Sequence, residues 1–354
     1  MKLRTISFPA ALVLVLAGSS LSVLGQESVE EHIAAARTAA GQEHTVLFEA
    51  LCATPPPAPL AQPSQPSQPS QPAQPAQPAQ PASPAAQPQD PPDRAQWHAD
   101  PVKVFDNLYY VGQTEYSAWA VTTSEGIIII DPIFEYSVEN EIVDGLTTLG
   151  FDPATIKYVI VSHGHRDHVG GARYLQDRFG ARVIMGAADW DLLDRNTQLF
   201  PKPRRDLVAT DGQKLVLGDT ALTLYVTPGH TLGTICTVLP VRDGESSHVA
   251  ALWGGTAFNW LRSVAYITPE TPPSFWFRSY ISSAERFRDI AAAAGADVLL
   301  SNHPQYDGSV TKLPAMSERR SDESHPYVIG TESVQRFLTV AAECAKAGLA
   351  RLGK

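Results

Sequence analysis

A proline-rich segment over residues 55–94 limits how this chain can fold more than any other feature. Fifteen of the 29 prolines lie between Pro55 and Pro92, and seven of these fifteen recur every three residues in Gln-Pro-Ser and Gln-Pro-Ala triplets. Proline fixes φ and has no backbone N–H, so such a run favours polyproline II and cannot join a packed core. We therefore expect residues 55–94 to be a disordered linker that acts as a semi-rigid spacer rather than as a ligand for a proline-binding module.

The linker divides the 354 residues into a short N-terminal part and one large folded part. Residues 1–25 place Lys2 and Arg4 ahead of an apolar stretch that ends near Gly25, which is typical of a secretory signal peptide. An uncleaved N-terminal anchor is the alternative. Residues 26–54 carry apolar residues at helical spacing, which predicts a short helical segment. We place the main domain at residues 95–354.

The expected signal peptide, the net charge and the distribution of apolar residues limit the class of protein to which this chain can belong. A signal peptide implies an exported protein, periplasmic or extracellular. The net charge of −10 and the absence of excess Lys and Arg argue against a nucleic-acid partner. No apolar run in the main domain reaches the roughly 18 residues needed to cross a bilayer, so we expect no membrane span in the mature chain. The oligomeric state stays open.

Three cysteines are too few for a disulfide-built scaffold or a cysteine-rich zinc site. Cys52 and Cys344 can pair in an oxidising compartment, but the position of Cys52 beside the proline-rich segment argues against it, and the sequence leaves the question open. Cys236 lies in an apolar run, which predicts a buried free thiol.

Hydrophobic periodicity indicates two blocks in which strands come first and helices alternate with strands afterwards. We expect β structure within residues 102–133, 155–162, 181–186, 214–227, 234–241, 248–255 and 296–301, and helices over residues 136–150, 168–180, 187–195, 277–295 and 331–353. Such an order predicts an α/β fold: a four-layer αβ/βα sandwich with two facing mixed sheets and outer helices.

The densest chemistry lies in the run His163-Gly164-His165-Arg166-Asp167-His168, directly after an expected strand. Imidazole and carboxylate groups are suitable ligands for Zn²⁺. This spacing lets His163 and His165 face one ion while Asp167 and His168 turn towards a second. His230 and His303 also follow apolar strands. A lone histidine after a strand is usually an ordinary polar residue. Here the run 163–168 needs further ligands, and His230 and His303 are candidates for that role.

The motifs His-Gly-His-Arg-Asp-His, Thr-Pro-Gly-His-Thr and Ser-Asn-His-Pro, in this order, resemble the metallo-β-lactamase superfamily over about residues 102–315. Asp131, after a run of four isoleucines, matches too. The resemblance implies the superfamily's fold and makes residues 95–354 its catalytic domain. It does not fix the substrate, because thioesterases, lactonases, phosphodiesterases and nucleases share the motif.

The end of the expected strand over residues 248–255 separates branches of the superfamily. Many of its hydrolases place a metal-bridging Asp there, and two β-lactamase subclasses place a Cys; this chain has Gly254, Gly255 and Thr256. The third subclass of class B β-lactamases lacks both. Resemblance to it implies two zinc ions, the first held by His163, His165 and His230. The second would be held by Asp167, His168 and His303.

The resemblance implies an exported zinc-dependent hydrolase that opens a small-molecule β-lactam by attack of zinc-bound hydroxide on the amide carbonyl, an antibiotic-resistance activity. Asp167 would orient the nucleophile, Thr256 and Asn259 would contact substrate, and Asp131 would fix the motif loop by hydrogen bonds. The alternative is a hydrolase of this fold acting on another ester, lactone or thioester. Antibiotic spectrum and metal occupancy stay open.

The remaining aromatic and histidine residues have plainer interpretations. An aromatic group either roofs the pocket or packs in the core, and it comprises Phe275, Trp276, Phe277 and Tyr280. Five further histidines read as surface or structural residues: His32, His44, His98, His248 and His325.

Overall fold

The computed structural model describes residues 28–53, 91–261, 263–320 and 322–353. The expected signal peptide, residues 1–25, and nearly all of the expected linker, residues 55–94, lie outside the described residues. Within the described ranges, no helix is both long enough and apolar enough to cross a membrane.

In the described part of the chain, a seven-stranded sheet forms one half of a sandwich, with its strands in sequence order. The first four strands pair antiparallel and the last four, from β4 onward, pair parallel. The isoleucines of β4 face both sides of the sheet alternately, because side chains of a strand alternate and both faces are covered. The strands are β1 (Val102–Phe105), β2 (Leu108–Tyr110), β3 (Trp119–Thr123), β4 (Gly126–Ile130), β5 (Ile156–Ile160), β6 (Arg182–Gly186) and β7 (Leu207–Ala209).

The second sheet has five strands among the described residues, in the order β12-β11-β10-β9-β8. β8 to β11 form an antiparallel meander, and β12 joins β11 in parallel. Both sheets are therefore mixed, as expected. The strands are β8 (Gln213–Leu217), β9 (Thr220–Val226), β10 (Ile235–Asp243), β11 (Ser246–Trp253) and β12 (Val298–Ser301).

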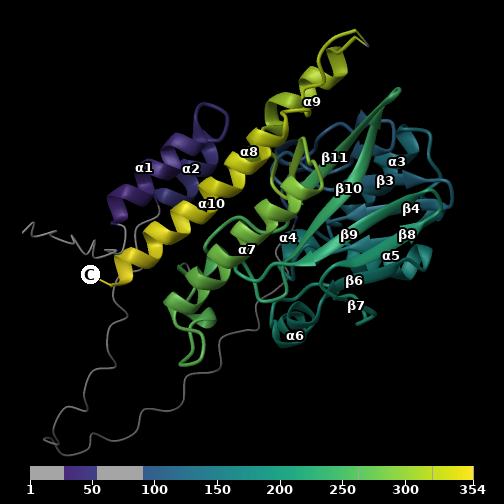
Figure 1. Cartoon of the computed structure of the whole chain (residues 1–354). Helices are drawn as coiled ribbons and strands as arrows, with labels where there is room; N and C mark the ends of the chain where they lie inside the picture. Colours follow the sequence, from purple (N-terminus) through teal and green to yellow (C-terminus); the bar gives the residue numbers. More distant parts are fainter. Residues whose placement is uncertain (1–27, 54–90, 262, 321, 354) are drawn as a thin grey trace, which may run out of the picture.

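Three buried clusters separate four layers. The central cluster lies between the sheets and joins residues such as Ile128 and Ile160 to Leu222 and Leu239. The second lies between the seven-stranded sheet and the helices that follow its strands. The third lies between the five-stranded sheet and the long helices. This is the predicted four-layer sandwich (Figure 1).

The outer helices cover the two sheets on opposite sides (Figure 1). Those on the seven-stranded sheet are α3 (Asp144–Thr148), which continues a π-helical turn (Glu139–Val143), α4 (Arg166–Val169), α5 (Ala172–Phe179) and α6 (Ala187–Arg195). The long helices on the five-stranded sheet are α7 (Pro273–Ala293) and α10 (Thr331–Leu352). Between them along the chain come α8 (Pro304–Asp307) and α9 (Ser309–Glu318).

The expected N-terminal helical segment consists of two helices, α1 (Val29–Ala40) and α2 (Thr45–Cys52). Figure 1 shows them, in purple, beside the yellow α10. Leu47, Phe48 and Leu51 join the same buried cluster as α7 and α10. The segment therefore differs from the expectation of a part separate from the main domain: it adds a partial fifth layer.

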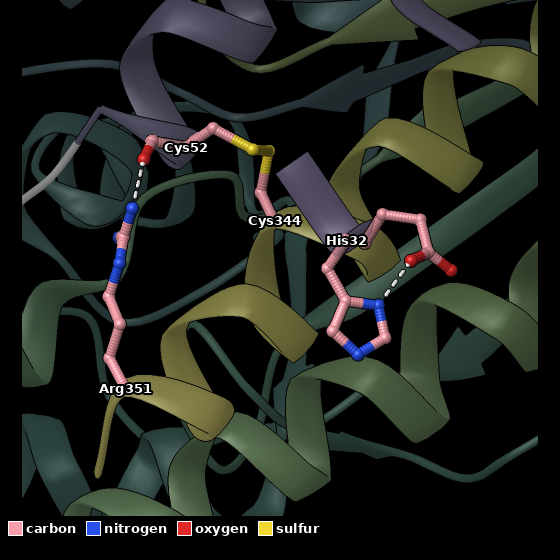
Figure 2. The surroundings of a disulfide bond; sticks show 5 residues. His32, Cys52, Cys344 and Arg351 are labelled. Atoms are coloured by element: carbon pink, nitrogen blue, oxygen red, sulfur yellow. Dashed lines mark hydrogen bonds and ion pairs between the residues drawn. A yellow bond between two sulfur atoms is a disulfide. The ribbon is translucent and has the colours of Figure 1, made fainter. Parts of the chain in front are cut away.

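A disulfide between Cys52 and Cys344 fastens α2 to α10 (Figure 2). Around it, the Arg351 guanidinium donates to the Cys52 carbonyl oxygen at 3.0 Å, and His32 contacts Glu343 with Nδ1 2.7 Å from Oε2. The sequence argument against this pair was wrong. Cys52 does lie beside the proline-rich segment, but it is also the last residue of a helix packed on α10.

The expected elements are present with shifted ends. The structure adds β7, α8 and α9, and it begins α7 at Pro273 rather than at residue 277. The helix expected over residues 168–180 is broken at Gly170 and Gly171. The backbone of residues 132–135 passes against both, and a Cβ at Gly171 would lie 2.2 Å from the Pro132 carbonyl oxygen, so both positions require glycine.

Candidate metal centre

Four of the predicted metal-ligating residues come from the loop after β5, at the carboxyl end of the seven-stranded sheet. His163 and His165 lie in the loop itself, and Asp167 and His168 lie in the first turn of α4. His230 follows β9 and His303 follows β12 in the other sheet. The two sheets thus contribute their histidines to one mouth of the sandwich.

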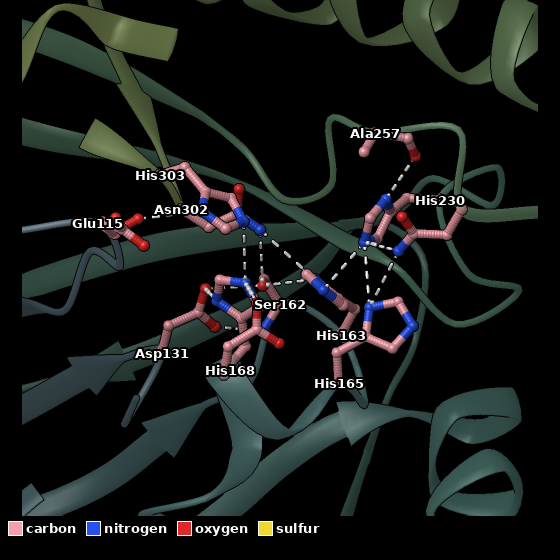
Figure 3. A network of polar contacts seen from close by, with 12 residues as sticks. Glu115, Asp131, Ser162, His163, His165, His168, His230, Ala257, Asn302 and His303 are labelled. Carbon is pink, nitrogen blue, oxygen red and sulfur yellow. Dashed lines mark hydrogen bonds and ion pairs between the residues drawn. The ribbon is translucent and has the colours of Figure 1, made fainter. Parts of the chain in front are cut away.

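Three imidazoles meet ring nitrogen to ring nitrogen (Figure 3). His230 Nε2 lies 3.0 Å from His163 Nε2 and 3.1 Å from His165 Nδ1. One ligand atom from each of the three lies within 4.8 Å of the others, so the group can hold a metal ion. The structure therefore brings together the predicted set His163, His165 and His230.

Hydrogen bonds fix which nitrogen of each ring carries the proton. His163 Nδ1 donates to the Gly254 carbonyl oxygen at 2.9 Å, and His230 Nδ1 donates to that of Ala257 at 2.7 Å. Each ring therefore presents an unprotonated Nε2 to the other. Two lone pairs at this distance repel each other unless a cation lies between them, so this donor set fits a metal ion.

Burial, and next to it the neighbouring imidazoles, hold the pKa of His163 well below its ordinary value. Burial has the same effect on the pKa of His230, and it lowers the pKa of His165 to about 4. All three rings are therefore neutral at physiological pH. Neutral imidazole is the form that binds metal ions.

A second group contains Asp167, His168 and His303. His168 Nε2 lies 3.2 Å from Asp167 Oδ2 and 3.3 Å from His303 Nε2. His303 Nδ1 donates to the Glu115 carbonyl oxygen at 3.0 Å, so its Nε2 is free to face the group. His163, Asp167 and His168 also offer ligand atoms within 4.8 Å of one another, which places the two groups side by side.

Carboxylates favour positive charge in the second group. Burial lowers the pKa of His168, but Asp167 and Asp131 outweigh it and raise this pKa to about 10. Burial raises the pKa of Asp167, and His168 and His165 outweigh that and hold it below the usual range. The second group is therefore a place for a cation, whether a proton or a metal ion.

Asp131 holds the first motif loop from below, as predicted. Its Oδ1 accepts from the Ser162 backbone N–H at 2.6 Å and its Oδ2 from the Ser162 hydroxyl at 2.7 Å, while Oδ2 lies 3.1 Å from His168 Nδ1 (Figure 3). The backbone of Asp131 has a φ of 59°, a conformation that costs free energy in a residue with a Cβ. The surrounding contacts maintain this conformation.

Gly254 and Gly255 leave no room for a carboxylate or thiol at the end of β11. A Cβ at Gly254 would lie 1.8 Å from the Ile235 carbonyl oxygen, and one at Gly255 would lie 2.5 Å from His230 Cβ. The Ile235 carbonyl group therefore explains glycine at position 254, and the side chain of His230 explains glycine at position 255.

A cavity of about 780 Å³ opens beside the histidines and is lined by residues that include His165, Asp167 and Asn259. Asn259 Nδ2 lies 3.1 Å from His230 Nε2, so the predicted substrate contact reaches the site. Thr256 does not line this cavity: its side chain is 1 % exposed, and its hydroxyl has no hydrogen-bond partner in the described ranges. Its predicted substrate contact has no support in this geometry.

Sequence reasoning missed three residues that organise the site. Tyr266 places its hydroxyl 2.5 Å from His165 Nε2, and Asn302 donates to the Gly254 carbonyl oxygen at 2.8 Å. Asp189, in the first turn of α6, accepts hydrogen bonds from both histidine loops. Asn302 precedes His303 in the Ser-Asn-His-Pro motif, so the motif could have identified it as a candidate. Tyr266 and Asp189 lie in no sequence motif, so no local pattern predicts their roles.

Most remaining expectations hold. Trp276, Phe277 and Tyr280 are buried in the core under α10, so the packing interpretation is correct for them, and Phe275 is partly exposed. Cys236 is a buried free thiol, as predicted. The five other histidines lie outside both histidine groups, as predicted.

Comparison with known proteins agrees with the resemblance found in the sequence motifs. Residues 111–243 match the metallo-beta-lactamase superfamily. BJP-1, a subclass B3 metallo-beta-lactamase of Bradyrhizobium japonicum, is similar in structure, with a TM-score of 0.56 and 28 % identity over 69 % of this chain and 91 % of that chain. The Rm3 metallo-beta-lactamase has a TM-score of 0.59 and 25 % identity over 73 % of this chain and 96 % of its own.

Curated relatives carry a different name. Hydroxyacylglutathione hydrolase of Acidiphilium cryptum is 39 % identical over 80 residues, which is 23 % of this chain and 29 % of that protein. The hydroxyacylglutathione hydrolase of Klebsiella pneumoniae is 29 % identical over 119 residues, which is 33 % of this chain and 41 % of its own length. The matched region thus spans less than half of these relatives.

Proposed function

We propose, from the premise that this chain contains a metallo-beta-lactamase superfamily domain, that the protein is a zinc-dependent hydrolase that opens the ring of β-lactams. The observation that carries the proposal is the convergence of His163, His165 and His230: the unprotonated Nε2 atoms of His163 and His230 lie 3.0 Å apart, and His165 Nδ1 lies 3.1 Å from His230 Nε2. Such a donor set is suited to Zn²⁺ with one position left for water.

In this proposal His163, His165 and His230 hold one zinc ion, and Asp167, His168 and His303 hold a second. Bound zinc lowers the pKa of water towards 7 and polarises a carbonyl group. The carbonyl oxygens of Gly254, Ala257 and Glu115 keep three of the rings oriented for this purpose.

The chain's own residues position the reactants. Asp167 lines the cavity, and its low pKa keeps it a carboxylate that accepts a hydrogen bond from the attacking water and orients it. Asn259 lines the same cavity and offers an amide N–H₂ to the substrate. We give no role in substrate binding to the enclosed Thr256.

Two observations favour a β-lactam over a thioester. The two solved structures described above, both named as β-lactamases, match this chain over 91 % and 96 % of their own length. The end of β11 also has no space for the bridging carboxylate of many other superfamily hydrolases. Thioester hydrolysis is the second candidate because of the 39 % identity to the Acidiphilium cryptum hydrolase.

We further propose that the protein is exported to the periplasm or the extracellular space. The basic and apolar residues 1–25 support this, and so does the disulfide between Cys52 and Cys344, because disulfides persist in oxidising compartments.

The test assays the purified chain against a chromogenic cephalosporin and a hydroxyacylglutathione thioester. Ring opening that a chelator abolishes and zinc restores is the expected result. His163→Ala should lower kcat/KM for the cephalosporin by roughly a thousandfold or more, equivalent to about 4 kcal/mol. Thioester turnover without ring opening would select the second candidate, and turnover of neither would refute both.

His248→Ala is the matched control. His248 lies on β11 and contacts Asp297, with Nδ1 2.6 Å from Oδ2, outside both histidine groups. This variant loses a half-buried imidazole, as His163→Ala loses a buried one, but it should keep full ring-opening activity. Equal losses in the two variants would mean that the His163 effect comes from general destabilisation.

A further inference from the structure

We propose that Asp189 is a positioning residue that locks the two histidine loops together and thereby sets the zinc affinity of the site formed by His163, His165 and His230. The inference rests on the proposed function only in taking zinc as the metal. Among the described residues, the Asp189 carboxylate accepts hydrogen bonds from Gly164, Thr231 and Gly233 and from none of the three imidazoles. Asp189 also belongs to none of the sequence motifs, so it acts through the loops that carry the histidines.

The Asp189 carboxylate joins two loops from different sheets. Its Oδ2 accepts from the Gly164 backbone N–H at 2.8 Å and from the Thr231 hydroxyl at 2.7 Å. Its Oδ1 accepts from the Gly233 backbone N–H at 2.9 Å. Gly164 lies between His163 and His165, and Thr231 follows His230, so two of the three bonds end beside a proposed ligand.

The backbone is closely packed around this carboxylate. A Cβ at Gly233 would lie 2.7 Å from Asp189 Oδ1, and a Cβ at Gly186, three residues before Asp189, would lie 2.2 Å from the Gly233 carbonyl oxygen. A Cβ at Gly164 would lie 3.1 Å from the Asp189 carbonyl oxygen. The end of β6 and both histidine loops are therefore in van der Waals contact at glycines, and Asp189 is fully buried.

A carboxylate is the side chain that this position requires. All three partners donate a hydrogen bond, and an ionised carboxylate accepts at both oxygens without presenting a donor of its own. Asparagine, which has the same shape, would set an N–H₂ group against a backbone N–H on one side. One buried donor would lose its partner, and the loops would no longer be held at a fixed separation.

Fixed loops bear directly on metal binding. His230 Nε2 lies 3.0 Å from His163 Nε2 across the junction that Asp189 spans. Holding these nitrogens near their coordinating positions removes an ordering cost from metal binding, and losing such outer contacts typically weakens metal affinity about 10- to 100-fold.

The test measures Zn²⁺ dissociation by competition with a chromophoric chelator, using the purified chain and its variants. Asp189→Asn should weaken zinc binding by about 10- to 100-fold. Thr231→Val, which removes one donor, should weaken it less, and Thr231→Ser, which keeps the hydroxyl, should bind like the unaltered chain. If Asp189→Asn does not fold, the zinc dissociation constants of Thr231→Val and Thr231→Ser are compared instead.

Glu141→Gln controls for general loss of stability. Glu141 is 2 % exposed and accepts from the Ala99 backbone N–H at 3.0 Å, away from both histidine loops. This variant should unfold at a lower temperature yet keep the zinc dissociation constant. Equal zinc affinity in Asp189→Asn and the unaltered chain would overturn the inference, and so would equal loss in Glu141→Gln.

The outcome is separable from that of the proposed function. A chain that binds zinc but opens no β-lactam ring refutes the function while the dissociation constants still decide the role of Asp189. Full ring opening with an unchanged dissociation constant in Asp189→Asn refutes the inference alone.

Discussion

Asp307, at the end of α8, is a second buried carboxylate that fastens a histidine-bearing loop. It accepts from the Ser301 backbone N–H at 2.7 Å and from that of Ser309 at 2.9 Å, on either side of His303. Burial raises its pKa from 3.8 to about 6, although Lys312 and these hydrogen bonds oppose the rise. The folded chain therefore binds a proton at Asp307 more tightly than the unfolded chain does.

This raised pKa predicts a pH dependence of stability. Protonated Asp307 stabilises the folded state fully below pH 3.8, and that contribution is lost as the pH rises through about 6. Asp307→Asn does not titrate, so the stability of the unaltered chain relative to this variant should fall by up to about 3 kcal/mol between about pH 4 and pH 7. Urea unfolding of both proteins in chelator measures it.

A constant difference between the two unfolding curves across that range would contradict the prediction. A stability difference that grows with pH would reverse the sign, and would mean that Lys312 and the backbone donors outweigh burial at Asp307.

At the scale of single residues, the sequence predicted the functional residues that are neighbours along the chain. His163, His165, Asp167 and His168 share one hexapeptide, so their chemistry is visible without a fold. Asp189 is invisible because its partners lie 25 to 44 residues away, and the reason for Gly255 is the ring of His230. Tertiary contact, and not any local pattern, decides such positions.

At the scale of elements, α1 and α2 form an N-terminal arm fastened to α10 by one disulfide. Leu47, Phe48 and Leu51 bury their side chains in the cluster that α7 and α10 share. Sequence periodicity predicted this segment as helical, but periodicity does not say which surface an apolar face covers. Two prolines made α8 and α9 hard to predict, because proline suggests a loop. Pro304 lies in the first turn of α8, where proline is tolerated, but Pro314 lies inside α9.

Removing the disulfide should loosen this arm. The bond closes a loop of 292 residues, and loss of a native disulfide typically costs about 2–5 kcal/mol. The double variant Cys52→Ser, Cys344→Ser should therefore unfold at a lower temperature and be cleaved by protease within α1 and α2 more readily than the unaltered chain. Thermal unfolding and limited proteolysis measure the two effects.

Reductant supplies the control. It should lower the unfolding temperature of the unaltered chain to that of the double variant and should not change the double variant, since Cys236 is buried and unpaired. An unaltered chain that unfolds at the same temperature with and without reductant would show that packing alone holds the arm.

At the scale of the whole molecule, the proposed metal centre joins the two sheets. His163 and His165 follow a strand of the seven-stranded sheet, while His230 and His303 follow strands of the five-stranded sheet. The layered architecture was predictable from the alternation of strands and helices, but the closeness of the two sets of loops depends on how the sheets face each other. A cation held by all of them links the two halves of the sandwich.

Zinc should therefore stabilise the fold and not only the loops. A ligand that binds only the folded state at 100 times its dissociation constant adds about 2.7 kcal/mol of stability. In a domain of this size that raises the unfolding midpoint by about 3–6 °C. Adding zinc to chelator-treated protein should produce this rise in a thermal melt, and His230→Ala should abolish most of it because the five-stranded sheet then loses a ligand.

His248→Ala separates this linkage from a general effect of histidine loss, since His248 lies on β11 of the same five-stranded sheet but pairs with Asp297 and belongs to neither histidine group. That variant should start from a lower midpoint and still rise with zinc as the unaltered chain does. If His230→Ala also keeps the full rise, the histidine that follows β9 is not a ligand. Because the rise is read without any substrate, it tests how the sheets are joined whichever bond the enzyme breaks.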